Sequence, residues 1–292
     1  MGRKIRPFLA LLCAMGAIVL IVKGHYVYSK GFRYNKVASV KPGAGNYQAA
    51  ITHNPLLDQP YYYLGKGRQT YAFESADQKY VLKFTRYHKY AMPLWARIYR
   101  HLPFTSSFLD GVLFEKRERK KRAFESYYIA KEFLGKSTGV VQLGLYPCIN
   151  PQIKVLVYFG KSRKVQVDLS KTSYVLQKKA APLEKELLHL QAENGSGKIN
   201  KLIGSFIKTF ATRMRKGILN RDYMNALRNC GCSDENVIEV DIGSFYYAKD
   251  FDYARELKIS TAPFKEFLRE RLPEYLSYFE QELDDEIQAA SK

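Results

Sequence analysis

Two glycines in a short turn, with a lysine downstream, are the first residues whose types and spacing could do chemistry. Gly65 and Gly67 lie between two strand-like stretches, and Lys83 ends a third such stretch, 16 residues after Gly67. Because glycine has no Cβ, the backbone N–H groups of such a turn can approach phosphate oxygens closely. The pattern predicts a phosphate-binding segment. Taken alone, it has an alternative in a plain β-turn followed by a surface lysine.

Oxygen-bearing side chains follow two later stretches of the chain. Asp222 comes after a long amphipathic helical pattern, and Asp241 ends the β-rich run of residues 237–240 (VIEV). Asn229 lies between them, 12 residues before Asp241. Phosphoryl transfer mainly demands that the reacting groups be positioned and their charge neutralised, and Mg²⁺ prefers oxygen ligands. For the last motif alone, the alternative is an ordinary strand that ends in an Asp-x-Gly turn.

In this order and spacing, four pieces of the chain resemble the protein-kinase-like superfamily. They are residues 64–72 (LGKGRQTYA), 80–83 (YVLK), 219–222 (LNRD) and 237–243 (VIEVDIG). The resemblance covers roughly residues 60–245 and implies that the cofactors are ATP and Mg²⁺. It also implies a two-lobed α+β fold, with an antiparallel β N-lobe and a reduced helical C-lobe.

The resemblance implies a role for each matching residue. Gly65 and Gly67 would bind the nucleotide, and Lys83 would hold its phosphates. Asp222 would accept or orient the proton of the attacking hydroxyl group. Asp241 would chelate the Mg²⁺ that bridges the β and γ phosphates.

The second metal ligand requires a choice between neighbouring residues. The family places its metal-binding asparagine five residues after the catalytic aspartate, where this chain has Leu227. Asn225 and Asn229 are the neighbouring asparagines. Asn229 is the better candidate, because its separation from Asp241 is close to the family's.

The family also pairs the phosphate-binding lysine with a carboxylate on the following helix. Glu125 is our candidate for the partner of Lys83, since it lies beside an apolar stripe on a helix predicted over residues 113–133. Glu118, two turns earlier, is the second candidate. The separation from Lys83 is longer than in typical protein kinases, which we attribute to an insertion at residues 86–111.

The chain departs from ordinary protein kinases at several positions. Thr70 stands at the third glycine position, Asn220 replaces the histidine of H-R-D, and Ile242 replaces the phenylalanine of D-F-G. No A-P-E motif follows, and only residues 244–292 remain for the substrate-binding half. The chain is in this respect more similar to compact relatives such as RIO kinases, aminoglycoside kinases and lipopolysaccharide core kinases.

An uninterrupted apolar run at residues 8–22 predicts an N-terminal transmembrane helix. Basic residues precede it, and no convincing A-x-A cleavage site follows, so an uncleaved single-pass anchor is favoured over a cleaved signal peptide. The run is short for a span, which needs about 20 residues. Further basic residues after it favour a cytoplasmic body. The expected localisation is therefore the membrane.

Four parts of the chain follow from these patterns. They are a membrane anchor with its flanks (1–28), a tether (29–58), a kinase-like N-lobe with its insertion (59–178) and a reduced helical C-lobe (179–292). Strands are expected at 61–64, 70–74, 79–84, 153–159, 164–169 and 173–178. Helices are expected at 113–133, 183–190, 200–216 and in the tail from 263 to 290, with a kink at Pro273.

The composition favours polyanionic partners. Forty-seven Lys and Arg residues against 28 Asp and Glu residues give a formal net charge of +19, which suits nucleotides, anionic lipids and phosphorylated glycans. No RNA-binding motif is present, so nucleic acid is not expected. The expected partners are a nucleotide and either an anionic membrane surface or a membrane-associated acceptor. Four cysteines do not make a disulfide framework in a chain of this length.

The sequence therefore predicts a membrane-anchored kinase-like phosphotransferase, which moves the ATP γ-phosphoryl group to a hydroxyl acceptor on a lipid, glycan or protein. The alternative is a pseudokinase scaffold that binds a nucleotide or a partner without catalysis. The missing third glycine, the lost histidine and the two extra residues of the catalytic loop favour it. A third class is a basic membrane-attached binding protein without a kinase fold.

Overall fold

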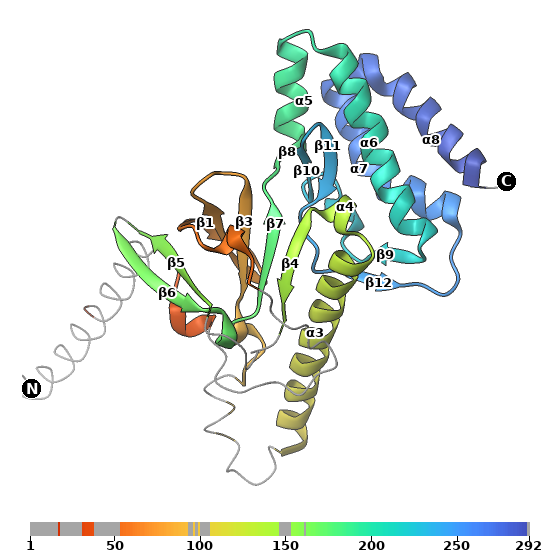
Figure 1. Cartoon of the computed structure of the whole chain (residues 1–292). Helices are drawn as coiled ribbons and strands as arrows, with labels where there is room; N and C mark the ends of the chain where they lie inside the picture. The colour runs from red at the N-terminus through yellow and green to blue at the C-terminus, as the bar shows by residue number, and fades with distance from the viewer. Residues whose placement is uncertain are drawn as a thin grey trace, which may run out of the picture.

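The computed structural model describes residues 17, 31–37, 53–92, 96, 99, 106–145, 153–160 and 162–290. In this part of the chain, a seven-stranded sheet stands beside a group of helices, and the long helix α3 (Ser106–Glu132) extends beyond the sheet (Figure 1). The fold is mixed α+β.

The sheet begins with an antiparallel meander of three strands that carries the glycine turn and Lys83. Its strand order is β4-β7-β3-β2-β1-β5-β6. Neighbouring strands are antiparallel except β1 and β5, which run parallel. The strands are β1 (Tyr61–Lys66), β2 (Thr70–Ser75), β3 (Tyr80–Thr85), β4 (Val140–Gly144), β5 (Lys154–Phe159), β6 (Arg163–Asp168) and β7 (Tyr174–Lys178).

Apolar residues alternate along these strands, as the two-residue period of a strand requires. On β2, Tyr71 and Phe73 are fully buried. Ala72 points to the other face, where its cross-strand partner is Lys83 on β3. Leu82, the residue before Lys83, is fully buried. Lys83 therefore lies on the face of the sheet opposite its aromatic core.

Part of the segment predicted as a tether packs into that aromatic core. Phe32 and Val37 are fully buried, and the Phe32 ring lies edge-on to Phe73, with centroids 5.0 Å apart. Leu57, in a short 3₁₀ turn, is also buried. The described residues of this segment thus behave as a packed lead-in to the sheet.

Most of the helices other than α3 follow the seven-stranded sheet in the sequence. They are α4 (Gly135–Thr138), α5 (Leu183–Ala192), α6 (Ser196–Arg215), α7 (Tyr253–Arg271) and α8 (Leu276–Ala290). The 3₁₀ turns are η1 (Tyr34–Lys36), η2 (Pro55–Leu57), η3 (Tyr87–Lys89), η4 (Leu169–Lys171), η5 (Tyr223–Asn225) and η6 (Pro273–Tyr275). The break at Pro273 separates α7 from α8, because proline lacks the N–H that would continue a helix.

Helix α6 is the central helix of this group. Phe206 and Phe210, four residues apart, are both buried, and their ring centroids lie 4.6 Å apart. Phe264 of α7 packs on Phe206 with a centroid distance of 4.3 Å. The apolar stripe predicted for residues 200–216 therefore faces a core that α7 and α8 complete.

Five short strands connect the helices to the region of the predicted site. They form a three-stranded sheet in the order β11-β10-β8 and a two-stranded sheet of β12 and β9. Their bounds are β8 (Ala181–Pro182), β9 (Ile218–Asn220), β10 (Cys230–Ser233), β11 (Asn236–Glu239) and β12 (Phe245–Tyr247). Residues 222 and 241, which carry the predicted chemistry, follow β9 and β11.

A junction core of apolar side chains lies where the sheet, α3 and the short strands meet. It contains Phe124 and Ile129 of α3, Val175 of β7, and Ile242 and Phe245 beside β12. The predicted site therefore sits on a packed junction.

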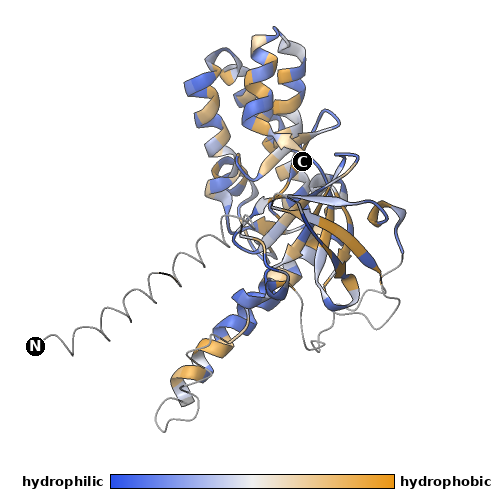
Figure 2. Cartoon of the chain, turned by 90° about the vertical axis from the view of Figure 1, so that its left-hand side faces the viewer, coloured by the Kyte–Doolittle hydropathy of each residue, from blue (hydrophilic) through white to orange (hydrophobic). Residues whose placement is uncertain are grey.

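Helix α3 begins earlier than predicted, at Ser106 instead of residue 113, and thus inside the insertion predicted at 86–111. Its middle is hydrophilic, and its N-terminal part carries hydrophobic residues (Figure 2). Phe108 and Phe114 there are 65% and 61% exposed. Most residues between 92 and 106 lie outside the described part of the chain.

The predicted transmembrane helix is wrong. Among the described residues, no helix combines the length and the apolar character that a membrane span requires. The described helices are amphipathic or strongly charged, as α3 is over residues 115–122 (EKRERKKR). The run at residues 8–22 lies outside the described residues, apart from Ala17. The single-pass anchor, the membrane localisation and the cytoplasmic orientation derived from it are corrected accordingly.

Candidate active site

Lys83 points from β3 toward the segment that carries Asp241. Its Nζ donates to the backbone carbonyl of Val240 at 2.6 Å and to Gln177 Oε1 on β7 at 2.6 Å. Burial lowers the pKa of Lys83 to about 8, and the nearby charge of Asp241 opposes that shift. The lysine is thus fixed between the sheet and the residue that precedes Asp241.

The segment around Asp241, which we call the DIG loop (residues 240–245), is held by its own backbone. The N–H of Val240 donates to the carbonyl of Asn229 at 2.7 Å. Gly243 N–H donates to Asp241 Oδ1 at 3.2 Å, and Arg221 N–H donates to the Ser244 carbonyl at 3.1 Å. The Asp241 side chain itself is exposed.

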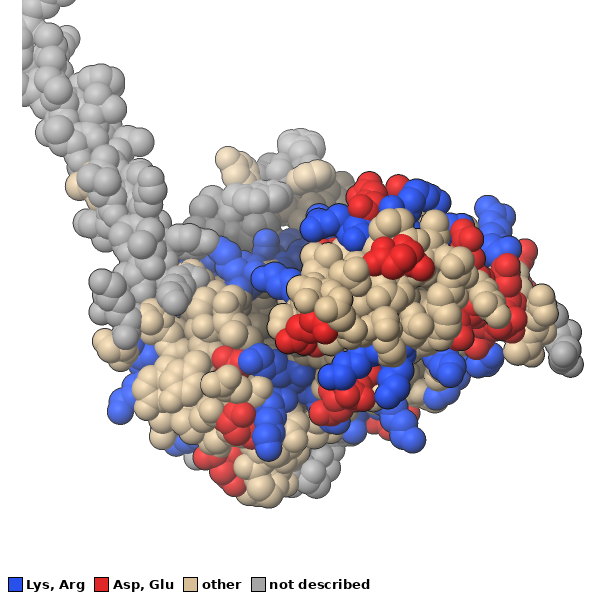
Figure 3. Space-filling view, turned by 90° about the horizontal axis from the view of Figure 1, so that it is seen from above, with Lys and Arg blue, Asp and Glu red and all other residues tan. Residues whose placement is uncertain are grey.

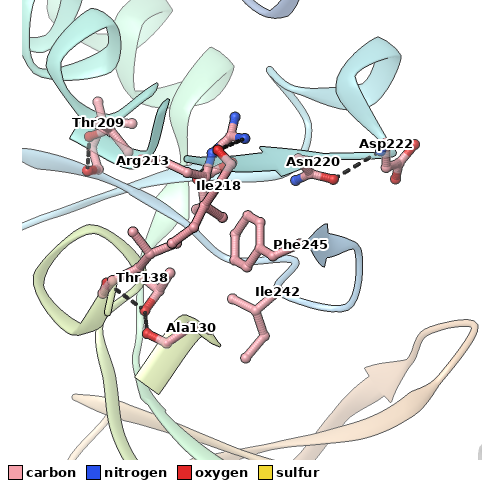
Figure 4. A network of polar contacts seen from close by, with 12 residues as sticks. Ala130, Thr138, Thr209, Arg213, Ile218, Asn220, Asp222, Ile242 and Phe245 are labelled. Carbon is pink, nitrogen blue, oxygen red and sulfur yellow. Dashed lines mark hydrogen bonds and ion pairs between the residues drawn. The ribbon is translucent and has the colours of Figure 1, made fainter. Parts of the chain in front are cut away.

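Asp222 is oriented by two asparagines, one on each carboxylate oxygen. Asn225 Nδ2 donates to Oδ1 at 2.7 Å, and Asn229 Nδ2 donates to Oδ2 at 3.1 Å. The Asp222 N–H donates in turn to Asn220 Oδ1 at 2.9 Å, which Figure 4 shows along the end of β9. Both asparagines considered from the sequence therefore touch Asp222, and Asn229 also contacts the DIG loop.

The glycine turn lies over the DIG loop. Gly67 N–H and the Thr70 carbonyl close the turn at 2.9 Å, and Arg86 Nη1 donates to the Gly67 carbonyl at 2.6 Å. A Cβ added to Gly65 would meet nothing within 4 Å, and one on Gly67 would meet only Thr70 at 3.8 Å. Both glycines thus face free space, where a phosphate could approach the backbone.

Gln69, between the glycines and β2, reaches across to the DIG loop. A Cβ built on Gly243 would lie 2.6 Å from Gln69 Oε1, so the Gln69 amide packs directly on that glycine. Gln69 Oε1 also accepts a hydrogen bond from the Tyr127 hydroxyl at 2.9 Å. The glycine turn, α3 and the DIG loop therefore meet at one side chain.

The structure does not bring Glu125 to Lys83. Gln177 and a backbone carbonyl occupy the lysine instead. Glu125 lies near Tyr247, whose pKa is raised by burial and by the charges of Tyr128 and Glu125. Its neighbours on α3 make the contacts to the site, namely Ser126 and Tyr127.

Sequence reasoning missed Gln177, Ser126 and Gln69. Gln177 is almost fully buried, and its Nε2 donates to the carbonyls of Thr138 at 2.5 Å and Glu239 at 3.2 Å. The available signal was the single amide side chain, Gln177, within the otherwise apolar stretch 174–177 (YVLQ). A polar group in such a strand needs a hydrogen-bond partner, because buried polar groups are normally hydrogen-bonded.

A buried ion pair supports the strands beneath the site. Arg213 Nε donates to Glu239 Oε2 at 3.0 Å, and both side chains are at most 2% exposed. Arg213 also donates to the Ile218 carbonyl at 3.3 Å (Figure 4). Burial raises the pKa of Glu239, and the charge of Arg213 partly opposes the rise. The pair links α6 to β9 and β11, which are the strands that precede Asp222 and Asp241.

The donor set fits one Mg²⁺ ion. The Asp241 carboxylate is exposed, and Asn229 keeps its Oδ1 as an acceptor while its Nδ2 binds Asp222. Mg²⁺ is usually held by one or two carboxylates together with phosphate and water. In the described part of the chain, no group of three or more His, Cys, Asp or Glu residues could hold a metal by itself. Any metal here would therefore be completed by a ligand's oxygens.

Basic side chains gather on one face of the molecule. Seen from above the helices, Lys and Arg side chains lie in the recess between the sheet and the helical group (Figure 3). A separate cavity of about 940 Å³ opens between α4, α6 and the β10–β11 turn, and Lys83, Asp222, Asn229 and Asp241 do not line it. We therefore locate the candidate site at the junction core.

Comparison with known proteins gives a weak likeness to a kinase. No family model matches the chain, and no curated protein matches it either. The medium-resolution structure of the bifunctional kinase-methyltransferase WbdD is similar to it, with a TM-score of 0.34 and 14% sequence identity. The match covers 74% of this chain and 43% of that chain, so this chain spans less than half the length of that one. We rest no functional conclusion on a likeness of this size.

Proposed function

We propose that the chain is a kinase-like phosphotransferase that moves the γ-phosphoryl group of ATP to a hydroxyl acceptor on a lipid, glycan or protein. The observation that supports it best is one connected set of contacts. Lys83 binds the carbonyl of Val240, Asn229 binds the backbone of Val240 and the side chain of Asp222, and Asp241 follows Val240 directly. Residues from three distant parts of the chain thus meet, which supports the proposal because phosphoryl transfer depends mainly on positioning and charge neutralisation.

Each residue of the candidate site has contacts that are compatible with a role in phosphoryl transfer. Lys83 would hold phosphate oxygens, and its fixed position would reduce the entropy lost on binding. Asp222 would accept the acceptor's proton, since its two asparagine partners orient the carboxylate and leave lone pairs available. Bound Mg²⁺ would neutralise phosphate charge, and Asp241 with Asn229 would hold it.

Nucleotide binding by the full chain tests this proposal. We would titrate a non-hydrolysable ATP analogue by calorimetry with and without Mg²⁺, using Lys83→Ala and Asp241→Ala. In the presence of Mg²⁺, we expect the affinity to fall by about tenfold or more in each variant, because Lys83→Ala loses a charged contact to phosphate and Asp241→Ala loses a metal ligand. Only Asp241→Ala should also lose the improvement that Mg²⁺ gives to the wild type.

Matched controls are available on exposed helix surfaces. Lys258→Ala on α7 and Asp284→Ala on α8 remove the same charges far from the site in sequence, and both side chains are exposed. Their affinities should equal that of the wild type. A folded wild-type chain that binds no nucleotide with Mg²⁺ would refute the proposal.

One observation favours a second candidate, a pseudokinase that binds a nucleotide or a partner without catalysis. Lys83 donates to a neutral amide and a backbone carbonyl, and among the described residues a carboxylate affects it only through the nearby charge of Asp241. Phosphoryl transfer from radiolabelled ATP to a panel of lipids, glycans and proteins separates the two. Turnover that Asp222→Asn abolishes supports the enzyme, whereas nucleotide binding without turnover supports the pseudokinase.

A further inference from the structure

Ser126 makes the closest contact between α3 and the DIG loop. Its hydroxyl donates to the Ile242 carbonyl at 2.5 Å, and it accepts a hydrogen bond from the Phe245 N–H at 2.6 Å. Ser126 is fully buried, and Ile242 and Phe245 are almost fully buried. The one hydroxyl group therefore satisfies a buried backbone acceptor and a buried backbone donor.

These two bonds fix the shape of the DIG loop. The Ile242 carbonyl and the Phe245 N–H are the pair that a β-turn would join directly. Here the Ser126 hydroxyl group lies between them and bonds to both, so it replaces the direct hydrogen bond of the turn. This turn begins one residue after Asp241, and its Gly243 N–H donates to Asp241 Oδ1 at 3.2 Å, so the turn contacts the Asp241 carboxylate directly.

Tyr127, the next residue, makes the corresponding contact to the glycine turn. Its hydroxyl donates to Gln69 Oε1 at 2.9 Å, and the same amide rests on Gly243. Tyr127 is 3% exposed, and burial raises the pKa of its hydroxyl well above the ordinary value. The hydroxyl therefore stays protonated and acts as a donor.

Two consecutive residues of α3 thus contact the two loops between which a nucleotide would bind. We propose that Ser126 and Tyr127 are positioning residues of the site. Ser126 sets the metal-binding geometry of Asp241, and Tyr127 sets the distance between the glycine turn and the DIG loop. Glu125, the residue of α3 that the sequence had favoured, stands directly before these two residues in the chain. This inference rests on the proposed function.

The competing explanation is that both hydroxyl groups only stabilise the fold. A buried carbonyl left without its donor costs stability whatever the loop does. The two explanations differ in what they predict for Mg²⁺. Only a positioning role makes the metal dependence of nucleotide binding change separately from the affinity for nucleotide alone.

The test compares Ser126→Ala and Tyr127→Phe with the wild type in the full chain. We would measure the Mg²⁺ concentration that half-saturates binding of the non-hydrolysable ATP analogue, and the analogue's affinity without Mg²⁺. Ser126→Ala should raise the half-saturating Mg²⁺ concentration by about tenfold, because two hydrogen bonds are lost. Tyr127→Phe should weaken binding of the analogue severalfold and leave the half-saturating Mg²⁺ concentration unchanged.

Two other residues of α3 give matched controls. Ser107→Ala removes an exposed hydroxyl from the same helix, and Tyr128→Phe removes the hydroxyl of a side chain that is 39% exposed. Both should behave as the wild type. Hydrogen exchange at the Phe245 amide, followed without nucleotide, should be faster in Ser126→Ala alone, which checks the contact itself independently of any activity.

The outcomes separate this inference from the proposed function. Wild-type binding that does not depend on Mg²⁺ refutes the proposed function and the inference with it. Normal wild-type binding, with Ser126→Ala folded, faster in exchange at Phe245 and unchanged in its Mg²⁺ curve, overturns the positioning role alone. If Ser126→Ala does not fold, Tyr127→Phe decides, and wild-type affinity in that variant overturns the inference.

Discussion

At the residue scale, Lys83 differs from a surface lysine because its ammonium group is buried between β3, β7 and the DIG loop. Its pKa lies near 8 as a result of burial. Between that value and its ordinary pKa of 10.5, the unfolded chain binds more protons than the folded chain, so this group makes stability rise with pH in that window. The affinity of Lys83 for phosphate should instead fall as the pH rises through this window, because the lysine loses its charge.

We expect the affinity for the ATP analogue to fall severalfold between pH 7.5 and pH 9, because neutral Lys83 loses its attraction to phosphate. The analogue's own phosphates are already ionised at those pH values. Calorimetry of the wild type and of Lys83→Arg measures the effect, since arginine stays charged throughout. An equal fall in Lys83→Arg would assign the titration to another group.

Most of the candidate residues could be named from sequence because motif order and spacing carry the information. The partners of Lys83 could not, because Gln177 and the Val240 carbonyl lie on β7 and on the DIG loop, not on α3. Which residue of α3 faces the DIG loop depends on how the helix is rotated about its axis, since successive helix residues point about 100° apart. The packing of Phe124 and Ile129 in the junction core sets that rotation, and neither residue shows it in the sequence.

At the element scale, the unit formed by α6, β9 and β11 carries the two loops of the site. Arg213 and Glu239 join its members through one buried ion pair. Replacing one partner of such a pair leaves the other charge buried and unpaired. The pair therefore matters most when it is half removed.

Glu239→Gln should lower the free energy of unfolding by about 3–5 kcal/mol, because Arg213 would keep its buried charge without a counter-charge. Urea unfolding measures the change. Glu280→Gln is the control, since Glu280 pairs with Lys265 at an exposed position, with side chains 48% and 36% exposed. A loss below about 1 kcal/mol, as for surface pairs, would contradict the prediction.

The long elements could be predicted from sequence, whereas most of the short strands after the sheet could not. Helix α6 repeats its apolar residues at helical spacing, and β2 alternates them. In contrast, Cys230 and Cys232 belong to none of the strands expected from the sequence, but they lie in β10. That strand is four residues long and pairs with both β11 and β8, so partners distant in sequence decide its conformation.

At the scale of the whole molecule, the junction core connects the sheet to the helical group. Val175 of the sheet, Phe124 of α3 and Phe245 of β12 belong to the same buried cluster. A two-lobed arrangement was expected from the resemblance, and two lobes with separate cores could unfold separately. A shared core instead couples them.

We expect a single thermal transition in calorimetry, with calorimetric and van't Hoff enthalpies equal. A nucleotide present at 100 times its dissociation constant should stabilise the whole chain by about 2.7 kcal/mol. Scanning calorimetry with and without the analogue and Mg²⁺ checks both statements. Two resolved transitions, of which the nucleotide shifts only one, would show that the junction core does not couple the halves.

The contact between Gln69 and Gly243 has a consequence for how this chain can change over evolutionary time. The backbone at position 243 has no left-handed φ that would require glycine, and the atoms that a methyl group would meet belong to the end of a flexible side chain. An alanine there would displace the Gln69 amide and break its bond to Tyr127. If residue 69 were first shortened, the same alanine would meet no obstacle there. The two positions should therefore drift together, and a substitution that is harmful in this background would be neutral in a lineage that had changed residue 69 first.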